Sequence, residues 1–477
     1  MKVCFLIPPE PVAETPAERS AGCTRVVYPM PNLYELTVAA LIEANGFAVR
    51  YEDLTYNGAD LAAFIGRDDS DVYLIWSVNL SRAADFAARD AILAMKPAAK
   101  VIFLGPGATF FPKLYLTDSR VIIVRGEPEL SVMELLECLR DGRAWRSLQG
   151  LTVLDSEGKI VRNPSRPLMT DLDSLPFPAR HLLGKQQFHN PKLKLSPYTT
   201  MLTSRNCPFH CIYCVPSSLT FARELDFRAD NGRKPPISFR SVESVEKEID
   251  ALAAEGYRAI GFVDDNFIWT EDRTAGICRA LKKHGIIWGC QARADAITEP
   301  IARMLGESGC TYIDLGVESF NDEILKFIRK GETSEQIFKA IELLQKYKVP
   351  VKLNILIGTS PLETKDTLKD TLRKAKKLKV DQVMFNIVSP FPGTEFYKLA
   401  KENGWIKGGE YSPTNVQRDS ILSYPHLSAE EMERTLFRFN LRYFLSPRIV
   451  WTHLRRFRSF GEFRSAFKAL WVKLFGK

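Results

Sequence analysis

The stretch Thr203-Ser-Arg-Asn-Cys-Pro-Phe-His-Cys-Ile-Tyr-Cys214 places three cysteines, Cys207, Cys211 and Cys214, within eight residues. It follows a segment of alternating apolar residues that is typical of a strand. A cubic iron–sulfur cluster has four irons, so three closely spaced thiolates hold it and leave one iron open to another ligand. The spacing therefore predicts a 4Fe-4S cluster on a loop that follows a strand.

A tyrosine, Tyr213, stands directly before the last cysteine of this Cys-x3-Cys-x2-Cys pattern. The pattern resembles the signature of radical S-adenosylmethionine (SAM) enzymes. In that family the open iron takes the amino and carboxylate groups of SAM, and an electron from the cluster breaks a C–S bond to give a 5′-deoxyadenosyl radical. The resemblance implies that Tyr213 packs near the adenine and that an electron donor such as flavodoxin or ferredoxin serves the cluster. The alternative role of Tyr213 is to shield the cluster from water.

The same loop offers a second arrangement, a structural zinc site formed by Cys207, His210, Cys211 and Cys214. Zinc modules normally place two pairs of ligands on separate loops a dozen or more residues apart. Because these four residues are packed more tightly than that, we interpret His210 as a loop residue. Three further cysteines lack close partners in the sequence and are predicted to be buried core residues: Cys278, Cys290 and Cys310.

The composition is that of a large globular enzyme. Of the 477 residues, 45% are apolar, and a chain of this length suggests about three domains. Nine cysteines, an odd number, argue against a disulfide framework. The apolar run before Pro8 is too short for a secretion signal, and no window reaches the roughly 18 apolar residues of a membrane span. We therefore expect a cytoplasmic protein.

Residues 1–150 alternate short apolar runs with segments of helical periodicity. The predicted strands are Val3–Ile7, Ala48–Tyr51, Val72–Trp76, Val101–Leu104 and Val121–Val124. The predicted helices are Leu33–Ala44, Ala83–Met95 and Leu130–Leu139. Such units predict an α/β fold with a doubly wound, Rossmann-like sheet whose ligand crevice lies at the carboxyl ends of its strands. Gly105 and Gly107 lie at this edge, where a ligand could approach the backbone.

The same segment resembles the cobalamin-binding domain found ahead of many radical SAM cores. The motifs that carry this resemblance are Pro8-Pro9, Gly105-Pro-Gly-Ala-Thr109 and Val124-Arg-Gly-Glu127. The first 180 residues contain no histidine, so the Asp-x-His-x-x-Gly motif is absent and this domain cannot give cobalt a histidine ligand. An ordinary strand-to-helix connection also explains the glycines, and loss of cobalamin binding is the alternative.

Residues 151–195 are predicted to form a small hairpin, Leu151–Leu154 with Ile160–Arg162, and then a proline-rich linker over the surface. Residues 196–405 alternate again and predict a partial (β/α)6 barrel, which the resemblance identifies as the radical SAM core. The predicted strands are Thr199–Thr203, Ala259–Val263, Ile286–Cys290, Tyr312–Val317, Val351–Ile357 and Val383–Val388. The predicted helices include Val242–Ala254, Asp272–His284, Ile301–Ser308, Ser334–Tyr347 and Lys365–Leu378.

The ends of these strands carry the residues that resemble family positions around SAM. Asp264 or Asp265 would accept hydrogen bonds from the SAM amino group, or one of them would cap the following helix. Arg293 would bind the SAM carboxylate through paired hydrogen bonds. Glu318 would meet the ribose or the methionine end, and Gly358 the adenine. A surface salt bridge is the alternative for Arg293 and Glu318.

Residues 406–477 form a C-terminal extension in which eight basic residues and one acidic residue fall within positions 448–477. This segment therefore holds nearly all the net charge of +8. Aromatic residues recur there at helical spacing: Phe460, Phe463, Phe467, Trp471 and Phe475. Such a basic amphipathic helix either contacts an anionic membrane, here the inner face, or packs its aromatic side on the barrel. No RNA or DNA module accompanies the charge, so we expect no nucleic acid partner.

The resemblances together imply a radical SAM enzyme that uses a 4Fe-4S cluster, SAM and cobalamin to transfer a methyl group to an unactivated carbon. A radical cyclase or oxidative rearrangement enzyme is the first alternative, since the architecture also resembles the anaerobic magnesium-protoporphyrin monomethyl ester cyclases. A non-catalytic metal-binding protein is the second. We expect a small-molecule substrate, or a lipid if the tail meets a membrane.

Overall fold

The computed structural model describes the whole chain except residues 11–14, 27, 187, 413–414, 448 and 451–477. The aromatic helix predicted over residues 460–475 lies outside the described residues. The chain divides into two compact units. The first comprises Met1–Phe209, Cys214–Ile313 and Lys346–Val349, and the second comprises His210–Tyr213, Asp314–Gln345 and the chain from Pro350 on.

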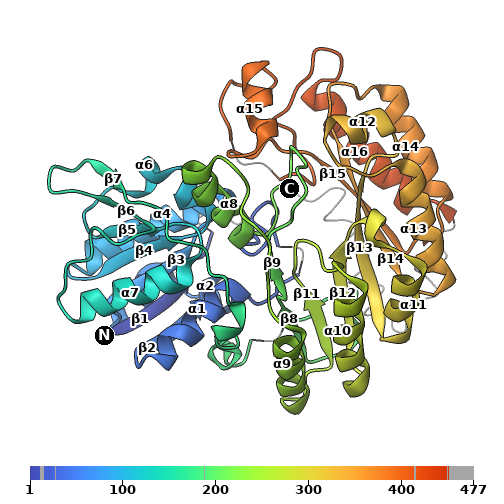
Figure 1. Cartoon of the computed structure of the whole chain (residues 1–477). Coiled ribbons are helices and arrows are strands. Elements are labelled where there is room, and N and C mark those ends of the chain that lie inside the picture. The colour runs from blue at the N-terminus through green and yellow to red at the C-terminus, as the bar shows by residue number, and fades with distance from the viewer. Residues whose placement is uncertain (11–14, 27, 187, 413–414, 448, 451–477) are drawn as a thin grey trace. The chain divides into compact units, whose positions relative to one another are not determined.

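A seven-stranded sheet lies in the first unit (Figure 1), with the strand order β2-β1-β3-β4-β5-β6-β7. Strands β1 to β5 pair in parallel, and β6 and β7 continue the sheet in antiparallel pairing. The strands are β1 (Lys2–Ile7), β2 (Ala48–Asp53), β3 (Val72–Trp76), β4 (Lys100–Leu104), β5 (Val121–Val124), β6 (Leu151–Leu154) and β7 (Ile160–Arg162). All five residues of β3 are buried, because a central parallel strand is covered on both faces.

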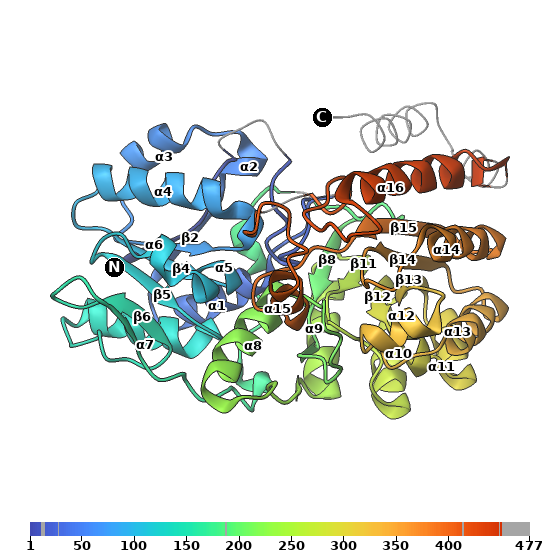
Figure 2. The ribbon, with the colours of Figure 1, turned by 90° about the horizontal axis from the view of Figure 1, so that it is seen from above.

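Helices cover both faces of this sheet, as Figure 2 shows. Val3 and Phe5 of β1 pack in the core beneath α1 and α7, whereas Cys4 and Leu6 pack in the core beneath α3 and α4. This alternation is the period of two that a strand imposes on its side chains. It confirms the predicted doubly wound N-terminal domain. The helices are α1 (Leu33–Ala44), α2 (Leu54–Asn57), α3 (Leu61–Arg67), α4 (Arg82–Met95), α5 (Pro106–Phe110), α6 (Pro112–Tyr115) and α7 (Pro128–Arg140).

The hairpin β6–β7, which the sequence places in the connector, extends the first sheet. Ile123 of β5 pairs with Thr152 of β6 in antiparallel register. The buried Arg125 strengthens this join, because its guanidinium donates to Thr152 Oγ1 at 2.6 Å and to the carbonyl of Asn163 at 2.6 Å. A hairpin pattern in the sequence indicates two strands, but it does not reveal a third strand that they join.

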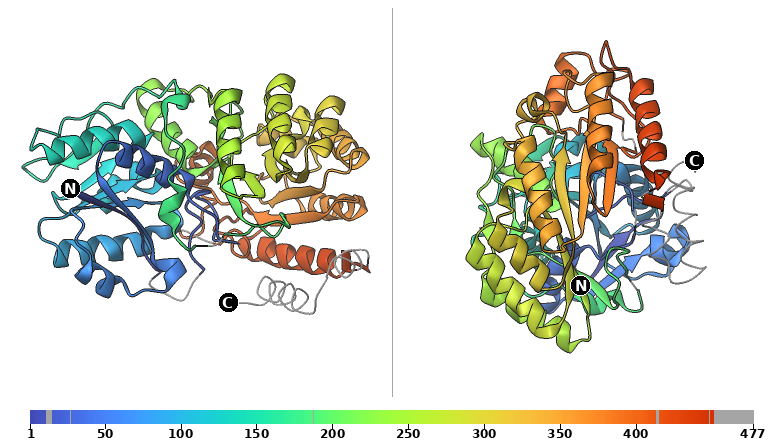
Figure 3. Two further views of the ribbon diagram at one scale, coloured as in Figure 1. Left: turned by 90° about the horizontal axis from the view of Figure 1, so that it is seen from below. Right: turned by 90° about the vertical axis from the view of Figure 1, so that its right-hand side faces the viewer.

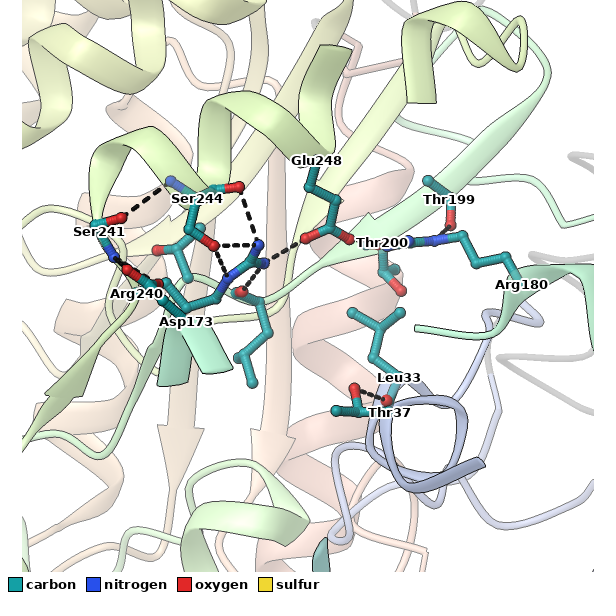
Figure 4. A network of polar contacts seen from close by, with 12 residues as sticks. Leu33, Thr37, Asp173, Arg180, Thr199, Thr200, Arg240, Ser241, Ser244 and Glu248 are labelled. Carbon is teal, nitrogen blue, oxygen red and sulfur yellow. Dashed lines mark hydrogen bonds and ion pairs between the residues drawn. The ribbon is translucent and has the colours of Figure 1, made fainter. Parts of the chain in front are cut away.

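The proline-rich linker, which the sequence predicts to lie over the surface, is held in place by a buried ion pair. Arg180 of the linker is buried, and its guanidinium lies 2.6 Å from Glu248 of α9 and donates to Thr199 Oγ1 at 3.0 Å. Figure 4 shows Glu248 between Arg180 and a second arginine, Arg240. Leu172 of the linker is also buried. Most other linker residues, the prolines included, are exposed or partly exposed, so the segment follows the surface and is held there by a few buried side chains.

A six-stranded sheet follows, with the strand order β15-β14-β13-β12-β11-β8. The pairs β8–β11, β11–β12 and β14–β15 are parallel. The strands are β8 (Tyr198–Met201), β11 (Ala259–Phe262), β12 (Ile287–Ala292), β13 (Cys310–Glu318), β14 (Val351–Ile357) and β15 (Gln382–Ile387). Directly after β8 in sequence comes β9 (Ser204–Arg205), which forms a short antiparallel pair with β10 (Ser238–Phe239). The six strand–helix units confirm the predicted partial barrel.

Several helices of this part begin where Ser or Thr side chains cap free N–H groups. Ser241 caps α9, and Thr270 caps α10, which ends at the left-handed Gly285. In the second unit α16, the red helix in Figure 3, runs along β15, where Phe439 and Phe385 contact each other. The helices are α8 (Ser218–Asn231), α9 (Val242–Ala254), α10 (Glu271–His284), α11 (Glu299–Glu307), α12 (Asp322–Phe327), α13 (Ser334–Lys346), α14 (Lys365–Lys377), α15 (Glu395–Glu402) and α16 (Ala429–Phe444). Over the described part of the chain, none of them is long and apolar enough to cross a bilayer.

Candidate active site

The three-cysteine loop runs from β9 to α8, beyond the carboxyl end of β8. Cys207, Cys211 and Cys214 are partly exposed, and His210 between them is exposed. Within the described ranges no group of three or more His, Cys, Asp or Glu side chains is already arranged to hold a metal ion. The cluster ligands therefore remain a prediction from the cysteine spacing.

Asp264, directly beyond β11, binds the start of the cysteine loop. Its buried carboxylate accepts hydrogen bonds from the backbone N–H of Thr203 at 3.1 Å, from the Thr203 hydroxyl at 2.8 Å and from the Ser204 hydroxyl at 2.6 Å. Burial raises the pKa of Asp264 to about 6, because desolvation outweighs these hydrogen bonds. The side chain thus fixes the backbone just before the cysteines.

Asp265, the next residue, binds the other end of the loop. Its carboxylate accepts from the backbone N–H of Ser217 at 2.6 Å and from the Thr220 hydroxyl at 2.5 Å. Burial raises the pKa of this carboxyl as well. Two neighbouring carboxylates at the end of one strand therefore hold both ends of the cysteine loop. Neither caps the helix that follows β11, since Thr270 caps α10.

The residue before the first cysteine has a strained backbone. Asn206 is buried and has φ +77°, the left-handed region that asparagine tolerates better than most residues. The fully buried Arg223 of α8 donates to the side chain of Asn206, and the Asn206 N–H donates to Thr220 Oγ1 at 3.3 Å. Strained backbone that its surroundings hold in place is common at functional sites.

Arg293, beyond β12, packs against the cysteine loop. Its guanidinium lies 3.5 Å from the ring centroid of Phe209, a cation–π contact. The same group forms paired hydrogen bonds with Asp295, at 3.0 Å and 2.8 Å. Arg293 is therefore beside the loop, as the sequence predicts, but Asp295 takes part of its hydrogen-bonding capacity.

In the second unit, Glu318 ends β13 with a left-handed backbone, φ +63°. Its buried carboxyl accepts a hydrogen bond from Tyr213 and lies 3.7 Å from Lys330 Nζ. Burial raises the pKa of Glu318, and Lys330 opposes that rise. A Cβ at Gly316 would lie 3.0 Å from both Glu318 Oε1 and Lys330 Nζ, so glycine leaves room for the pair. Glu318 is therefore a buried carboxylate that contacts Tyr213 and Lys330, and it is not part of a surface salt bridge.

Gly358, beyond β14, forms a tight turn with φ +82°. Its N–H donates to Glu363 at 2.8 Å, and its carbonyl accepts from the Tyr424 hydroxyl at 2.7 Å. Glu363 also accepts from the N–H of Thr359 at 3.0 Å, and burial raises its pKa to about 6. The Ser360-Pro-Leu sequence therefore keeps an ordered turn at this strand end.

Gly105 and Gly107 approach the protein's own backbone closely. Gly105 has φ +88°, and a Cβ there would lie 2.7 Å from the carbonyl of Ser77. A Cβ at Gly107 would lie 2.7 Å from the Tyr115 hydroxyl. Both glycines are thus required by packing against the end of β3. This packing explains the glycine motif without a ligand.

A buried polar cluster occupies the carboxyl edge of the first sheet. Arg19 lies 2.8 Å from Asp85, which also accepts hydrogen bonds from the hydroxyls of Ser77 and Ser81. Arg19 also donates to the carbonyl of Trp76, the last residue of β3. Among the described residues, the buried Asn79 Oδ1, just beyond β3, lacks a hydrogen-bond partner.

Sequence reasoning missed the arginines that support the loop. Arg205 lies two residues before Cys207 and bonds to Glu127 and Glu129, which begin α7. Arg223 lies in α8, where helical periodicity indicates only that it follows the cysteines. The available sequence signal for Arg205 was its place two residues before Cys207. Its partners could not be found that way, because they are 76 and 78 residues away.

Comparison with known proteins indicates which family the central part of the chain resembles. Residues 201–375 match the model of the radical SAM superfamily. The chain is 29% identical over 462 residues to an uncharacterised methyltransferase of Pyrococcus horikoshii, covering 94% of each. It is 24% identical over 474 residues to cytidylyl-2-hydroxyethylphosphonate methyltransferase of Streptomyces wedmorensis, covering 87% of this chain and 86% of that protein.

A solved structure shares the fold. It is the radical SAM methyltransferase TsrM of Kitasatospora setae with cobalamin and a 4Fe-4S cluster bound, which aligns with a TM-score of 0.64 at 17% identity over 91% of this chain and 81% of that one. The family match places a radical SAM domain at residues 201–375, the segment that holds the three cysteines and most of the six-stranded sheet.

Proposed function

We propose that this chain is a radical SAM methyltransferase that uses a 4Fe-4S cluster, SAM and cobalamin to methylate an unactivated carbon of a small molecule. The observation that carries the proposal is the three-cysteine loop beyond β8, with both ends bound by Asp264 and Asp265. Similarity over nearly the full length to proteins named methyltransferases supports the reaction class.

The thiolates of Cys207, Cys211 and Cys214 would hold three irons of the cluster. Their partial exposure and their spacing fit that task, since cluster assembly needs access and three closely spaced sulfurs. A reduced cluster with SAM bound supplies the one-electron cleavage that yields a 5′-deoxyadenosyl radical. The protein's part is to fix the loop, and the hydrogen bonds of Asp264 and Asp265 do this at both ends.

The contacts of the polar residues suggest how SAM would be held. Glu318 presents a buried carboxyl that Tyr213 and Lys330 orient, which suits a hydroxyl or ammonium group of SAM. A guanidinium has five N–H donors, so Arg293 can pair with Asp295 and still reach the SAM carboxylate. Gly358 would present its turn to the adenine. The SAM amino group would then rely on Glu318 more than on Asp264 or Asp265, whose oxygens bind the loop.

Cobalamin would bind at the carboxyl edge of the first sheet. The unpartnered buried atom Asn79 Oδ1 fits a ligand rimmed with amide groups, because such an atom is costly unless it is bonded. The first 180 residues hold no histidine, so a cobalt there would have no histidine ligand from this domain. Gly105 and Gly107 would shape this edge through packing on β3.

Anaerobic reconstitution with iron and sulfide tests the proposal. We expect about four irons per chain and a broad absorbance near about 400 nm that bleaches with dithionite. With SAM and a reductant, the enzyme should release 5′-deoxyadenosine, and with a corrinoid it should bind the pigment and transfer a labelled methyl group. Zinc alone, or no SAM cleavage, would overturn the proposal. SAM cleavage without corrinoid binding would favour a cyclase or rearrangement reaction.

We further propose that a flavodoxin- or ferredoxin-like protein reduces the cluster and that the basic aromatic tail contacts an anionic membrane. The sequence pattern over residues 448–477 supports the membrane contact. Co-sedimentation with anionic vesicles should disappear when residues 448–477 are deleted. Persistent binding by the shortened chain would show that the tail is not the contact.

A further inference from the structure

We propose that Arg205 is a positioning residue that fixes the cysteine loop to the acidic segment Glu127–Glu129 of the N-terminal domain. Arg205 is only 4% exposed. Its Nη1 lies 2.9 Å from Glu127 Oε1, and its Nη2 lies 2.6 Å from Glu129 Oε1. The Glu129 side chain is 1% exposed, so both charges are removed from water. Removing one partner would leave a buried charge uncompensated, which is strongly destabilising.

Glu127 also binds a second arginine that reaches the same loop. Its Oε1 lies 3.1 Å from Arg223 Nε, and Arg223 donates to the side chain of Asn206. Asn206 has the left-handed backbone that directly precedes Cys207. One carboxylate therefore joins the arginines on either side of this strained residue. The Glu127 carboxylate, through these two arginines, therefore holds the backbone that leads into Cys207.

The acidic residues belong to the carboxyl edge of the first sheet. Glu127 follows β5 after two residues, and Glu129 lies in the first turn of α7. The geometry of the loop thus depends on the domain that we propose to bind cobalamin. This inference rests on the proposed cluster at Cys207, Cys211 and Cys214. Surroundings and hydrogen bonding set the potential of such clusters, so a looser loop changes more than stability.

Hydrogen exchange of the chain without added iron tests the positioning role directly. We expect Arg205→Gln to speed exchange in peptides covering residues 203–217 by at least about tenfold, the loss expected for a charge-assisted hydrogen bond. Arg205→Lys should restore part of the protection, since lysine keeps the charge but cannot bind two carboxylates with a planar fork. Circular dichroism should match the wild type for both variants.

The matched control is Arg162→Gln. Arg162 of β7 pairs with the partly exposed Asp230 of α8 at 2.7 Å and with the buried Asp226 of α8 at 3.1 Å, and neither partner belongs to the cysteine loop. Exchange over residues 203–217 should remain at the wild-type rate in this variant. If Arg162→Gln speeds exchange as much as Arg205→Gln, general loosening between the first sheet and α8 explains the effect, and the proposal is overturned.

A second variant keeps the test decisive if Arg205→Gln does not fold. Glu129→Gln leaves Arg205 with Glu127 and should raise exchange over residues 203–217 by a smaller factor; an unchanged rate overturns the proposal. After reconstitution, Arg205→Gln should keep its iron but show altered electron paramagnetic resonance g-values when SAM is added to the reduced cluster, and Arg205→Lys should partly restore them. A wild-type chain that binds no cluster would count against the proposed function alone, because the exchange result does not involve iron.

Discussion

Replacement of Gly358 by alanine is the sharpest test of the turn beyond β14. The backbone there has φ +82°, which costs an alanine about 1–2 kcal/mol. The new Cβ would also lie 2.6 Å from Sδ of Met432, a fully buried residue of α16. Overpacking of this kind costs about 1–3 kcal/mol. We expect Gly358→Ala to lower the free energy of unfolding by about 2–5 kcal/mol in total.

Met432→Ala separates the two contributions. Alone it should cost about 2–5 kcal/mol, because it removes a buried side chain and leaves a cavity. In the double variant the clash disappears and only the backbone strain of Gly358→Ala remains. The double variant should therefore be more stable than the sum of the single effects predicts, by about 1–3 kcal/mol.

Urea unfolding followed by circular dichroism under anaerobic conditions measures all four proteins. The hydrogen bonds of Gly358 to Glu363 and Tyr424 involve its backbone, so the substitution does not remove their atoms. Additive effects within about 0.5 kcal/mol would refute the clash with Met432. A Gly358→Ala protein as stable as the wild type would refute the whole argument.

Three further variants test the site. Burial raises the pKa of Asp264 to about 6 from its usual value of 3.8, so its stabilising contribution is complete below about pH 4 and is lost as pH rises through 6. Urea titrations should show that between pH 5 and pH 8 the wild type loses about 1 kcal/mol that Asp264→Asn does not lose, and parallel pH profiles would contradict this. Cys207→Ala should abolish the absorbance near about 400 nm with the fold intact by circular dichroism, and a variant that keeps about four irons would exclude this cysteine as a ligand. Glu318→Gln should weaken SAM binding by at least about tenfold in calorimetry, since a charged acceptor is lost, and an unchanged Kd would remove Glu318 from the SAM site.

Much of the fold could be predicted because its central strands are apolar runs with most or every second residue buried. The apolar run Val72–Trp76 matches β3 residue for residue, and Val351–Ile357 matches β14. The short helices α2, α5 and α6 could not be predicted, because four or five residues cannot display helical periodicity. The pairing of the β6–β7 hairpin with β5 could not be predicted either, because the register between separate strands leaves no local pattern in the sequence.

The site could be predicted only as far as the order of the strand ends. That order places Asp264, Asp265, Arg293 and Glu318 at neighbouring strand ends, but it does not show which way each side chain points. Asp264 and Asp265 turn toward the loop, since five hydroxyl and amide groups of residues 203–220 donate hydrogen bonds to them there. The left-handed backbone of Glu318 is likewise a consequence of tertiary packing and not of its neighbours in sequence.

The two carboxylates at the end of β11 have a consequence for cofactor assembly. Their bonds to residues 203–204 and 217–220 join only polypeptide atoms, so the conformational entropy of the loop ends is lost when the chain folds. Ordering one backbone residue costs roughly 1–2 kcal/mol, and the six residues 203–204 and 217–220 no longer impose that cost when metal binds. The iron and sulfide ions therefore bind to a loop whose two ends are already ordered. Asp264 and Asp265 thereby raise the affinity for the cluster, although neither is one of its proposed ligands.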